Sequence, residues 1–374
     1  MSRVIERRRE LLAVMRRLTL EQGHFTVPEV MELCTLPRST VQDWVTRLLE
    51  EGCIVLQEER RGRHPAIYAA ASALPASACR RIFTTVDGDL VECYHECLSS
   101  GCAAFCAYHH ALAGGSLVHV QRDGTLLREC GVISEHDDVE IGLAPLPAVG
   151  VVGIRREGDE IVQQIRCVGG PAYSLTDQMA EAEGVCGVEA RRSGGVIEGE
   201  VRTRALVLLG IGVDDTDAAP GGGATFALAL ALLQHLSTIK GVIPISHRVA
   251  MLKPDIPERT AGNSCSYIEL AVDPGKVEEV TGRAVRFVSS EALSPEWGIA
   301  VREGFRHLPE LRDFGVRARE ERVTQEEAWD LASKSGILLK GGRGVVGALA
   351  AVALRGVPIG VLLDPFAAID ERMK

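Results

Sequence analysis

The sequence predicts a multidomain α/β protein, and three observations support this fold class. The chain has 374 residues, which is enough for two to three domains of ordinary size. Hydrophobic residues make up 46% of it and charged residues 25%, as in folded globular proteins. The pattern also changes twice along the chain, from helical periodicity to short glycine-rich apolar stretches, and then to a buried strand that leads into a helix. We therefore expect three domains, at residues 1–72, 73–203 and 204–374.

The charge and hydropathy of the chain limit where it acts. The formal net charge is −10, and an acidic chain is a poor general binder of nucleic acids. Residues 1–72 hold 11 Arg against 10 Asp and Glu, so the acidic excess lies in the remainder. No apolar run approaches the ~20 residues that span a bilayer. The opening MSRVIERRRE has no apolar segment behind its basic residues, unlike a signal peptide. We expect a cytoplasmic protein without a membrane partner.

The N-terminal segment predicts three helices followed by a hairpin. Apolar residues recur at helical spacing over residues 3–22. Thr26 is a suitable N-cap for a second helix, which is entered through a proline, and Ser39 for a third. Gly52 stands where the third helix should end. The stretches CIVLQEE and AIYAA then read as two strands around the basic turn RRGRHP.

Three helices and a basic hairpin form the winged helix-turn-helix pattern, and the phrase LPRSTVQDWVTRLLEEGCI resembles winged-helix transcription regulators. In such proteins the third helix enters the major groove and the hairpin meets phosphates. The alternative is a winged helix used for protein contacts or dimerisation, and we expect a homodimer. The residues expected to contact double-stranded DNA are Arg38, Ser39, Thr40 and Gln42 in the helix, and Arg60, Arg61, Arg63 and His64 in the hairpin.

The middle segment is a cysteine-rich α+β domain in our interpretation. The chain has 11 cysteines, an odd number without a secretion signal, which argues against a disulfide framework. Cys93, Cys97, Cys102 and Cys106 form two i, i+4 pairs on either side of Gly101. On helices such pairs share a face, and four thiolates suit zinc or an iron–sulfur cluster. The alternatives are buried apolar cysteines on a helical hairpin, or a redox-active dithiol.

The C-terminal segment begins with the clearest chemical pattern in the chain. Residues 205–211 form a continuous apolar run, as in a buried strand, and Asp214, Asp215 and Asp217 follow its end. Carboxylates suit Mg²⁺, and a glycine-rich entry into a helix suits phosphate. The alternative is an acidic surface turn and a flexible loop. The glycines expected to bind the nucleotide are Gly221, Gly222 and Gly223.

Two further stretches predict contacts with the same ligand. The loop LKPDIPERTAGN carries Lys253, Arg259 and Asn263 between two strands. Later, GILLKGGRGVVGALAAVAL is a second glycine-rich turn into an apolar helix, although it is not a Walker A sequence. Its backbone donors and cations suit a phosphorylated ligand. The residues assigned to this turn are Lys340, Gly341, Gly342, Arg343 and Gly344.

The motifs GVDDTD, GGATFALAL, LKPDIPERTAGN, GIAVREGF and KGGRGVVGALAAVAL together resemble the kinase-like domain of the archaeal isoleucine-tRNA agmatinylcytidine synthetase. The chain is also similar to the methanogenesis marker protein eleven family. The resemblance covers residues 204–366 and implies an ATP-binding domain in a methanogenic archaeon. It implies that Asp214, Asp215 and Asp217 serve Mg²⁺ and phosphates, and that the turn at 341–344 belongs to the same pocket. The synthetase carries a threonine that becomes phosphorylated, and Thr225 is the nearest hydroxyl here.

Two functions follow from these patterns. The first is a DNA-binding regulator of transcription that senses ATP–Mg²⁺, with a metal or redox state sensed by its cysteines. The second is an ATP-dependent, ligase- or kinase-like enzyme of methanogenesis that acts on a protein or small molecule, with the winged helix as an interaction module. The synthetase continues into further RNA-binding domains and this chain ends at Lys374, so we do not expect tRNA modification.

Overall fold

The computed structural model describes residues 3–73, 78–136, 138–168, 179–193, 196–218, 222–257, 259 and 262–369. Contacts within the chain divide it into two compact units, Met1–Ala78 and Cys79–Lys374. Gly221, one of the glycines expected to bind the nucleotide, lies outside the described residues. No helix in the described ranges is both long enough and apolar enough to cross a bilayer.

The first unit contains three helices and a small sheet in the predicted order. The helix expected over residues 3–22 is confirmed, and Thr26 caps the second helix in a capping box with Glu29. The third helix begins at Arg38, so Ser39 is not its N-cap; Pro37, with its fixed φ of −59°, already turns the chain into the helix. Its elements are α1 (Arg3–Gln22), β1 (Phe25–Thr26), α2 (Val27–Cys34), α3 (Arg38–Glu50), β2 (Ile54–Glu58) and β3 (Ile67–Ala70), with strand order β1–β3–β2.

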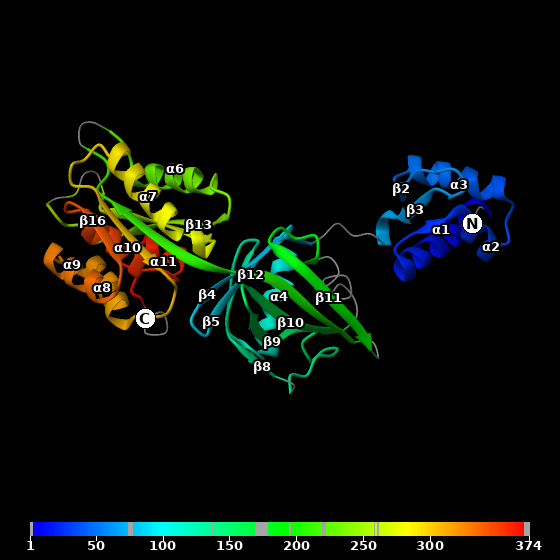
Figure 1. The fold of residues 1–374 in the computed structure, drawn as a ribbon, viewed down its shortest axis with the longest axis horizontal. Helices are drawn as coiled ribbons and strands as arrows, with labels where there is room; N and C mark the ends of the chain where they lie inside the picture. Colours follow the sequence, from blue (N-terminus) through cyan, green and yellow to red (C-terminus); the bar gives the residue numbers. More distant parts are fainter. Residues whose placement is uncertain are drawn as a thin grey trace. The chain divides into compact units, whose positions relative to one another are not determined.

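One long strand organises the second unit. β12 (Val196–Asp214) pairs with β10 (Glu160–Val168) and β11 (Val185–Ser193) through its first half. Its second half pairs with β14 (Ser264–Val272) and β15 (Gly298–Glu303). Figure 1 shows this strand running from one part of the unit into the other. The domain boundary expected between residues 203 and 204 therefore falls inside a continuous strand.

The first part of this unit is mostly strands, as its short apolar stretches predicted. The strand order is β6–β7–β5–β4–β12–β10–β9–β8, and β11 also pairs with β12. Its helix is α4 (Ser100–Ala113). Its remaining strands are β4 (Cys79–Asp87), β5 (Leu90–Cys97), β6 (Leu117–Asp123), β7 (Leu126–Val132), β8 (Ser134–Glu135) and β9 (Val149–Glu157).

The second part is an antiparallel sheet, ordered β13–β14–β12–β15–β16, with helices on both faces (Figure 1). Leu209, Ile211 and Val213 of β12 pack into the cluster that contains α6 and α7. Gly212 faces α10, because a Cβ there would lie 1.9 Å from the carbonyl oxygen of Ala348. The remaining elements are α6 (Thr225–Ser237), β13 (Val242–Met251), α7 (Val277–Glu291), α8 (Pro309–Glu320), α9 (Gln325–Lys334), β16 (Leu338–Gly341), α10 (Val345–Ala353) and α11 (Ile359–Leu363).

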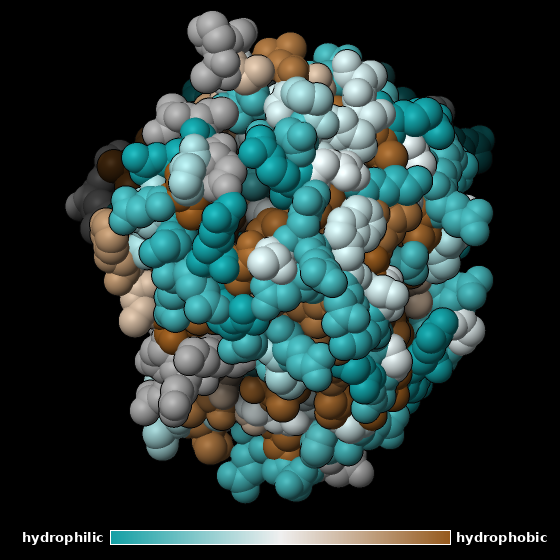
Figure 2. Space-filling view, turned by 90° about the vertical axis from the view of Figure 1, so that its left-hand side faces the viewer, coloured by the Kyte–Doolittle hydropathy of each residue, from teal (hydrophilic) through white to brown (hydrophobic). Residues whose placement is uncertain are grey.

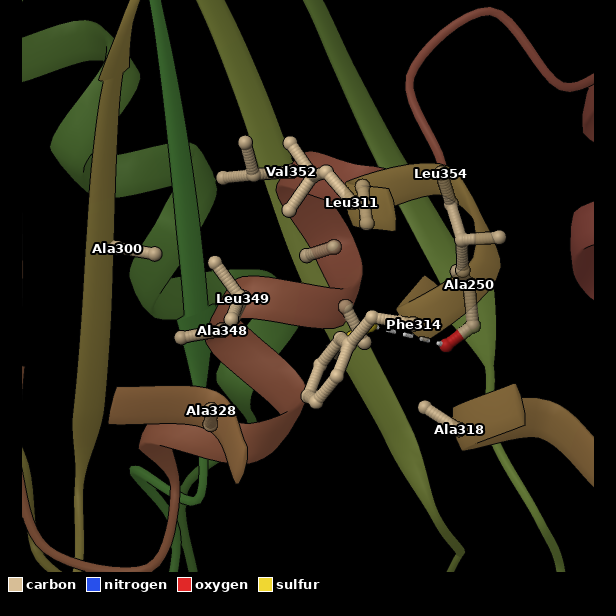
Figure 3. Packing of buried hydrophobic residues seen from close by; sticks show 14 of the residues in the cluster. Ala250, Ala300, Leu311, Phe314, Ala318, Ala328, Ala348, Leu349, Val352 and Leu354 are labelled. Carbon is tan, nitrogen blue, oxygen red and sulfur yellow. Dashed lines mark hydrogen bonds between the residues drawn. The ribbon is translucent and has the colours of Figure 1, made fainter. Parts of the chain in front are cut away.

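Helices α8, α9 and α10 bury the larger apolar core of this part. Figure 3 shows Phe314 and Leu311 of α8 packed with Leu349 and Val352 of α10. Alanines fill much of this core, and such small side chains let the helices and strands approach closely.

On the face that Figure 2 shows, hydrophobic residues are scattered among hydrophilic ones and form no continuous apolar surface.

A buried ionic network joins the two parts of this unit. Arg128 of β7 donates to Glu269 of β14 at 2.6 Å, and Arg355 donates to Glu269 at 2.8 Å and to Glu92 of β5 at 2.6 Å. The Tyr94 hydroxyl also donates to Glu92. Every one of these side chains has several charged or polar partners, as a buried charge requires.

Candidate functional site

The register of three strands brings the acidic turn and the second glycine-rich turn together. Asp214, at the end of β12, lies opposite Gly298 of β15, and Gly298 lies opposite Gly341 at the end of β16. A Cβ on Gly298 would lie 2.0 Å from the Gly344 carbonyl carbon and 2.1 Å from the Val345 nitrogen. Only glycine therefore allows the turn before α10 to lie across β15, beside the aspartates.

Asp214 is the most perturbed carboxyl of the acidic turn. Burial, together with the charges of Asp215 and Asp217, raises its pKa to about 8. Its carboxylate lies against α10, because a Cβ on Gly347 would meet Asp214 Oδ2 at 1.8 Å. Asp214 is thus a carboxyl that holds its proton near neutral pH until a cation offsets its surroundings.

The other two aspartates face hydroxyl groups. Asp215 has a φ of 51°, in the left-handed region, and accepts a hydrogen bond from Ser294 at 3.2 Å. Thr225, at the start of α6, donates to Asp217 Oδ1 at 3.4 Å and accepts from the Thr216 hydroxyl at 3.1 Å. Burial raises the pKa of Asp215, although Ser294 and Arg343 oppose that effect. The carboxylates and the hydrogen-bonded hydroxyl of Thr225 therefore lie at the same edge of the sheet.

The backbone of the second glycine-rich turn does not offer the donors that we expected. The amides of Gly342, Arg343 and Gly344 already donate to the Trp297 carbonyl, the Glu296 carboxylate and the Glu296 carbonyl, at 2.8, 2.9 and 2.7 Å. The acceptors Glu296 and Trp297 lie directly before β15. The packing of this segment against the turn therefore uses the amides for tertiary hydrogen bonds. Of this turn, Arg343 and Gly344 line the cleft described next.

A cleft of about 600 Å³ lies over these turns. The start of α6 faces the cleft, since Ala224 and Thr225 line it. The first turn of α6 has no side-chain cap, because the methyl group of Ala224 at the N-cap position cannot accept a hydrogen bond. Lys340, Gly341, Gly342 and Gly222 are not among its lining residues, and Lys340 is exposed. The predicted residues that line it are Asp214, Asp215, Asp217, Gly223, Thr225, Lys253, Arg259, Asn263, Arg343 and Gly344.

The proline-containing loop forms a second wall of the cleft. The Asn263 amide donates to the Lys253 carbonyl at 2.8 Å, which closes the base of the loop. The Lys253 ammonium contacts the Glu320 carbonyl at 3.3 Å, and an Arg259 guanidinium nitrogen donates to the Pro254 carbonyl. Cations and carboxylates thus line the same cleft, as a ligand with both metal and phosphate would require.

Sequence reasoning missed several residues of the site. Ser294 and Glu296 hold Asp215 and Arg343 from the segment before β15. Arg322, between α8 and α9, and Gln325, the first residue of α9, also line the cleft. The short motif GIAV, which begins with Gly298, was the available signal for the first pair; nothing local marked the second.

The donor set of the acidic turn fits Mg²⁺. Within the ranges that the structure describes, no three His, Cys, Asp or Glu side chains are grouped to hold a metal ion by themselves. Mg²⁺ does not need such a group, since it commonly takes one or two carboxylates together with substrate phosphates and water. Burial, and after it the charges of Asp215 and Asp217, raises the pKa of Asp214, and a nearby cation would oppose both effects.

Replacing Asp214 by asparagine is expected to stabilise the nucleotide-free protein at high pH. Between pH 4 and 8 the folded chain keeps a proton that the unfolded chain loses, so the wild type loses stability as pH rises through this window. Asp214→Asn removes this dependence. Urea denaturation should show a gain of at least about 1 kcal/mol at pH 8 relative to pH 5. An equal effect at both pH values would contradict the raised pKa.

The predicted cysteine group has a different composition in the structure. Cys97 contacts Cys79 and Cys102, and Cys102 contacts Cys106. Cys93 lies apart and is hydrogen-bonded to Thr84. The helical hairpin of the buried-cysteine alternative is wrong, because LVECYHEC forms strand β5 and only Cys102 and Cys106 lie on a helix. Strand pairing brings in Cys79, which is 18 residues from Cys97 along the chain.

Comparisons with known proteins relate part of this chain to a group of RNA-modifying enzymes. No protein-family profile matches it. The 2-agmatinylcytidine synthetase of an isoleucine tRNA, TiaS, from Pyrococcus horikoshii is 35% identical over 154 residues, which is 39% of this chain and 35% of the relative. The TiaS of Pyrobaculum neutrophilum is 32% identical over 148 residues, 38% of this chain and 34% of the relative. The chain is homologous to TiaS over this stretch and spans about a third of the length of these relatives.

Other matches are weaker. An uncharacterised protein of Methanocaldococcus jannaschii is 28% identical over 158 residues, 41% of this chain and 52% of the relative. A crystal structure of TiaS with tRNA and ATP aligns with 41% of this chain and 37% of its own, at 25% identity and a TM-score of 0.36.

These comparisons correct the first functional expectation. The relatives are named as enzymes that modify a tRNA, so the reading as a DNA-binding regulator of transcription is wrong. Double-stranded DNA is accordingly withdrawn as a partner of Arg38, Ser39, Thr40, Gln42, Arg60, Arg61 and Arg63. The second expectation, an ATP-dependent enzyme, agrees with the homology.

Proposed function

We propose that the protein is an ATP-dependent enzyme whose cleft binds Mg²⁺–ATP and transfers a phosphoryl group. One observation carries this proposal: the register Asp214–Gly298–Gly341 brings the acidic turn, the start of α6 and Arg343 to a single cleft. Carboxylates and cations in one cleft suit a metal-bound phosphate chain. Homology to a synthetase supports an enzyme at this site.

Each group of the cleft has a role in this proposal. Asp215 and Asp217, which line the cleft, would hold Mg²⁺ together with phosphate oxygens and water. The uncapped first turn of α6 and the Arg343 guanidinium would receive the phosphates. Lys253 and Arg259 would meet the rest of the nucleotide or the acceptor.

Thr225 is the hydroxyl placed for phosphoryl transfer within the chain. Thr216 donates to its oxygen and Asp217 accepts from it, so the hydroxyl is oriented and has a base at 3.4 Å. Attack by the Thr225 oxygen on a phosphorus of ATP would form a phosphothreonine, release the remaining nucleotide and give the proton to Asp217.

The homology also suggests the acceptor. The relatives are named as synthetases of 2-agmatinylcytidine in a tRNA, so we propose RNA as the substrate, contrary to our expectation from the sequence. The methanogenesis marker family and the winged-helix identity of the first unit remain proposals. In this account that unit is an interaction module, as in our second functional expectation.

Asp217→Asn is expected to abolish Mg²⁺-dependent cleavage of ATP, with a loss of at least about 100-fold, because it removes both a metal ligand and the base for Thr225. The assay follows labelled ATP with and without bulk tRNA. The matched control is Asp313→Asn, an exposed carboxylate of α8 outside the cleft.

Stimulation of wild-type cleavage by tRNA supports an RNA acceptor. Cleavage without stimulation overturns the RNA assignment but keeps the enzyme. Equal cleavage by the two variants, or no cleavage by the wild type, would overturn the proposed function.

A further inference from the structure

A second cluster of reactive side chains lies between β5 and α4, outside the lining of the cleft. Cys93, His95 and Cys97 alternate along β5, so they share one face of the strand. Cys102, Cys106 and His110 recur every four residues on α4, so they share one face of the helix. Contacts between the two rows show that these faces meet.

The thiols form a series of contacts across this interface. Cys79 and Cys97 are directly opposite each other in the pairing of β4 with β5, and their thiols are hydrogen-bonded. Cys97 is also hydrogen-bonded to Cys102, and Cys102 to Cys106. None of these cysteines is in a disulfide bond. The contacts run from one sulfur to the next and, in the described part of the chain, form no group that could hold a metal.

Two buried histidines, His95 and His110, approach the buried carboxylate of Glu129 beside the thiols. His110 Nδ1 lies 2.5 Å from Glu129 Oε1, and His95 Nε2 lies 3.6 Å from Glu129 Oε2. The rings of the two histidines meet edge to face at 6.3 Å. His110 and Glu129 are 1% and 0% exposed, yet His110 Nε2 and Glu129 Oε2 have no hydrogen-bond partner. Leaving such atoms unpaired costs about 1–3 kcal/mol each, which points to a role beyond stability.

Cys102 differs from its neighbours in reactivity and in access. It is partly exposed, whereas Cys79, Cys97 and Cys106 are buried. It stands in the first turn of α4, where the helix dipole favours an anion, and its amide donates to the cap residue Ser99 at 3.1 Å. Hydrogen bonds from Cys106 and Cys97 lower the pKa of Cys102, whereas the bond to Cys102 raises the pKa of each donor.

We propose that this cluster is a thiol–disulfide exchange site, in which Cys102 is the attacking nucleophile and Cys97 the resolving cysteine. The oxidant is a low-molecular-weight disulfide. The Cys102 thiolate attacks one sulfur of it, which forms a mixed disulfide and expels one thiolate. Cys97 then gives its proton to His95, which lies on the same strand face, and attacks Cys102 sulfur. The products are a Cys97–Cys102 disulfide and a second expelled thiolate, so two electrons pass to the oxidant.

The test uses the full-length protein, reduced and purified without oxygen, with hydroxyethyl disulfide as the oxidant. After alkylation, mass spectrometry should show that Cys97 and Cys102 escape labelling and that their peptide has lost two hydrogens. Cys97→Ser should accumulate the mixed disulfide on Cys102. Cys102→Ser should release thiol at least about 10-fold more slowly.

Cys186→Ser is the matched control. Cys186 is exposed as a residue, but partial desolvation of its sulfur raises its pKa, so its thiol should react less readily than that of Cys102. This variant should react as the wild type does, and circular dichroism should show that every variant is folded. Preferential reaction of Cys186 would overturn the proposal. So would stoichiometric zinc or iron in the purified protein with its thiols blocked. Neither outcome depends on ATP, so the proposal is separate from the proposed function.

Discussion

Gly298→Ala is expected to abolish nucleotide binding and to destabilise the second unit by about 3 kcal/mol or more. The new methyl group would lie 2.0–2.1 Å from backbone atoms of Gly344 and Val345. Backbone atoms at the start of α10 cannot move aside as a flexible side chain can. Either the turn leaves β15, which takes Arg343 away from the aspartates, or β15 shifts against β12.

Urea denaturation and calorimetric titration with Mg²⁺–ATP measure the two consequences of this substitution. Gly360→Ala is the control, since no atom lies within 4 Å of a Cβ placed on Gly360 of α11. It should leave binding unchanged. Wild-type affinity in Gly298→Ala would mean that the turn at 341–344 does not need its place beside Asp214.

Glu269→Ala is expected to destabilise the second unit by about 3–5 kcal/mol, because it leaves Arg128 and Arg355 buried without their shared carboxylate. The matched control is Asp330→Ala on α9, which breaks only an exposed ion pair with Lys334 and should cost at most about 1 kcal/mol.

The stabilisation from Glu269 should also depend on pH. Burial raises its pKa, but Arg128 and Arg355 outweigh burial and hold the pKa well below the ordinary value. Its contribution is therefore complete above the ordinary pKa of about 4.5 and is lost as pH falls toward the folded-state value. Thermal denaturation at pH 7 and pH 3 should show a smaller difference between wild type and Glu269→Ala at pH 3. A constant difference would contradict the ionised network.

Local patterns predicted the parts of the site that lie within one stretch of sequence. An apolar run followed by Asp214, Asp215 and Asp217 predicted a strand and an acidic turn, and the glycine-rich stretch after them predicted the entry into helix α6. In the first unit, helical periodicity and the Thr26 cap predicted α1 and α2. These features depend on neighbours in the chain, which a sequence displays directly.

Features that depend on distant partners were not predictable in this way. The amides of the turn at 341–344 are used by Glu296 and Trp297, and only the register of β15 reveals this. Cys79 joins Cys97 through the pairing of β4 with β5, whereas spacing alone favoured Cys93. An i, i+4 spacing also places residues on one face of a strand, so it could not distinguish β5 from a helix.

The central claim is that Asp214, Asp215, Asp217 and Arg343 form one Mg²⁺–nucleotide site. Calorimetric titration of the wild-type protein with ATP, with Mg²⁺ and then with chelator present, tests it most directly. We predict saturable binding of one ATP with Mg²⁺, at least about 10-fold weaker binding without it, and proton release near pH 7 as the cation displaces the proton of Asp214. Absence of ATP binding in the presence of Mg²⁺ would contradict the site and the function proposed for it.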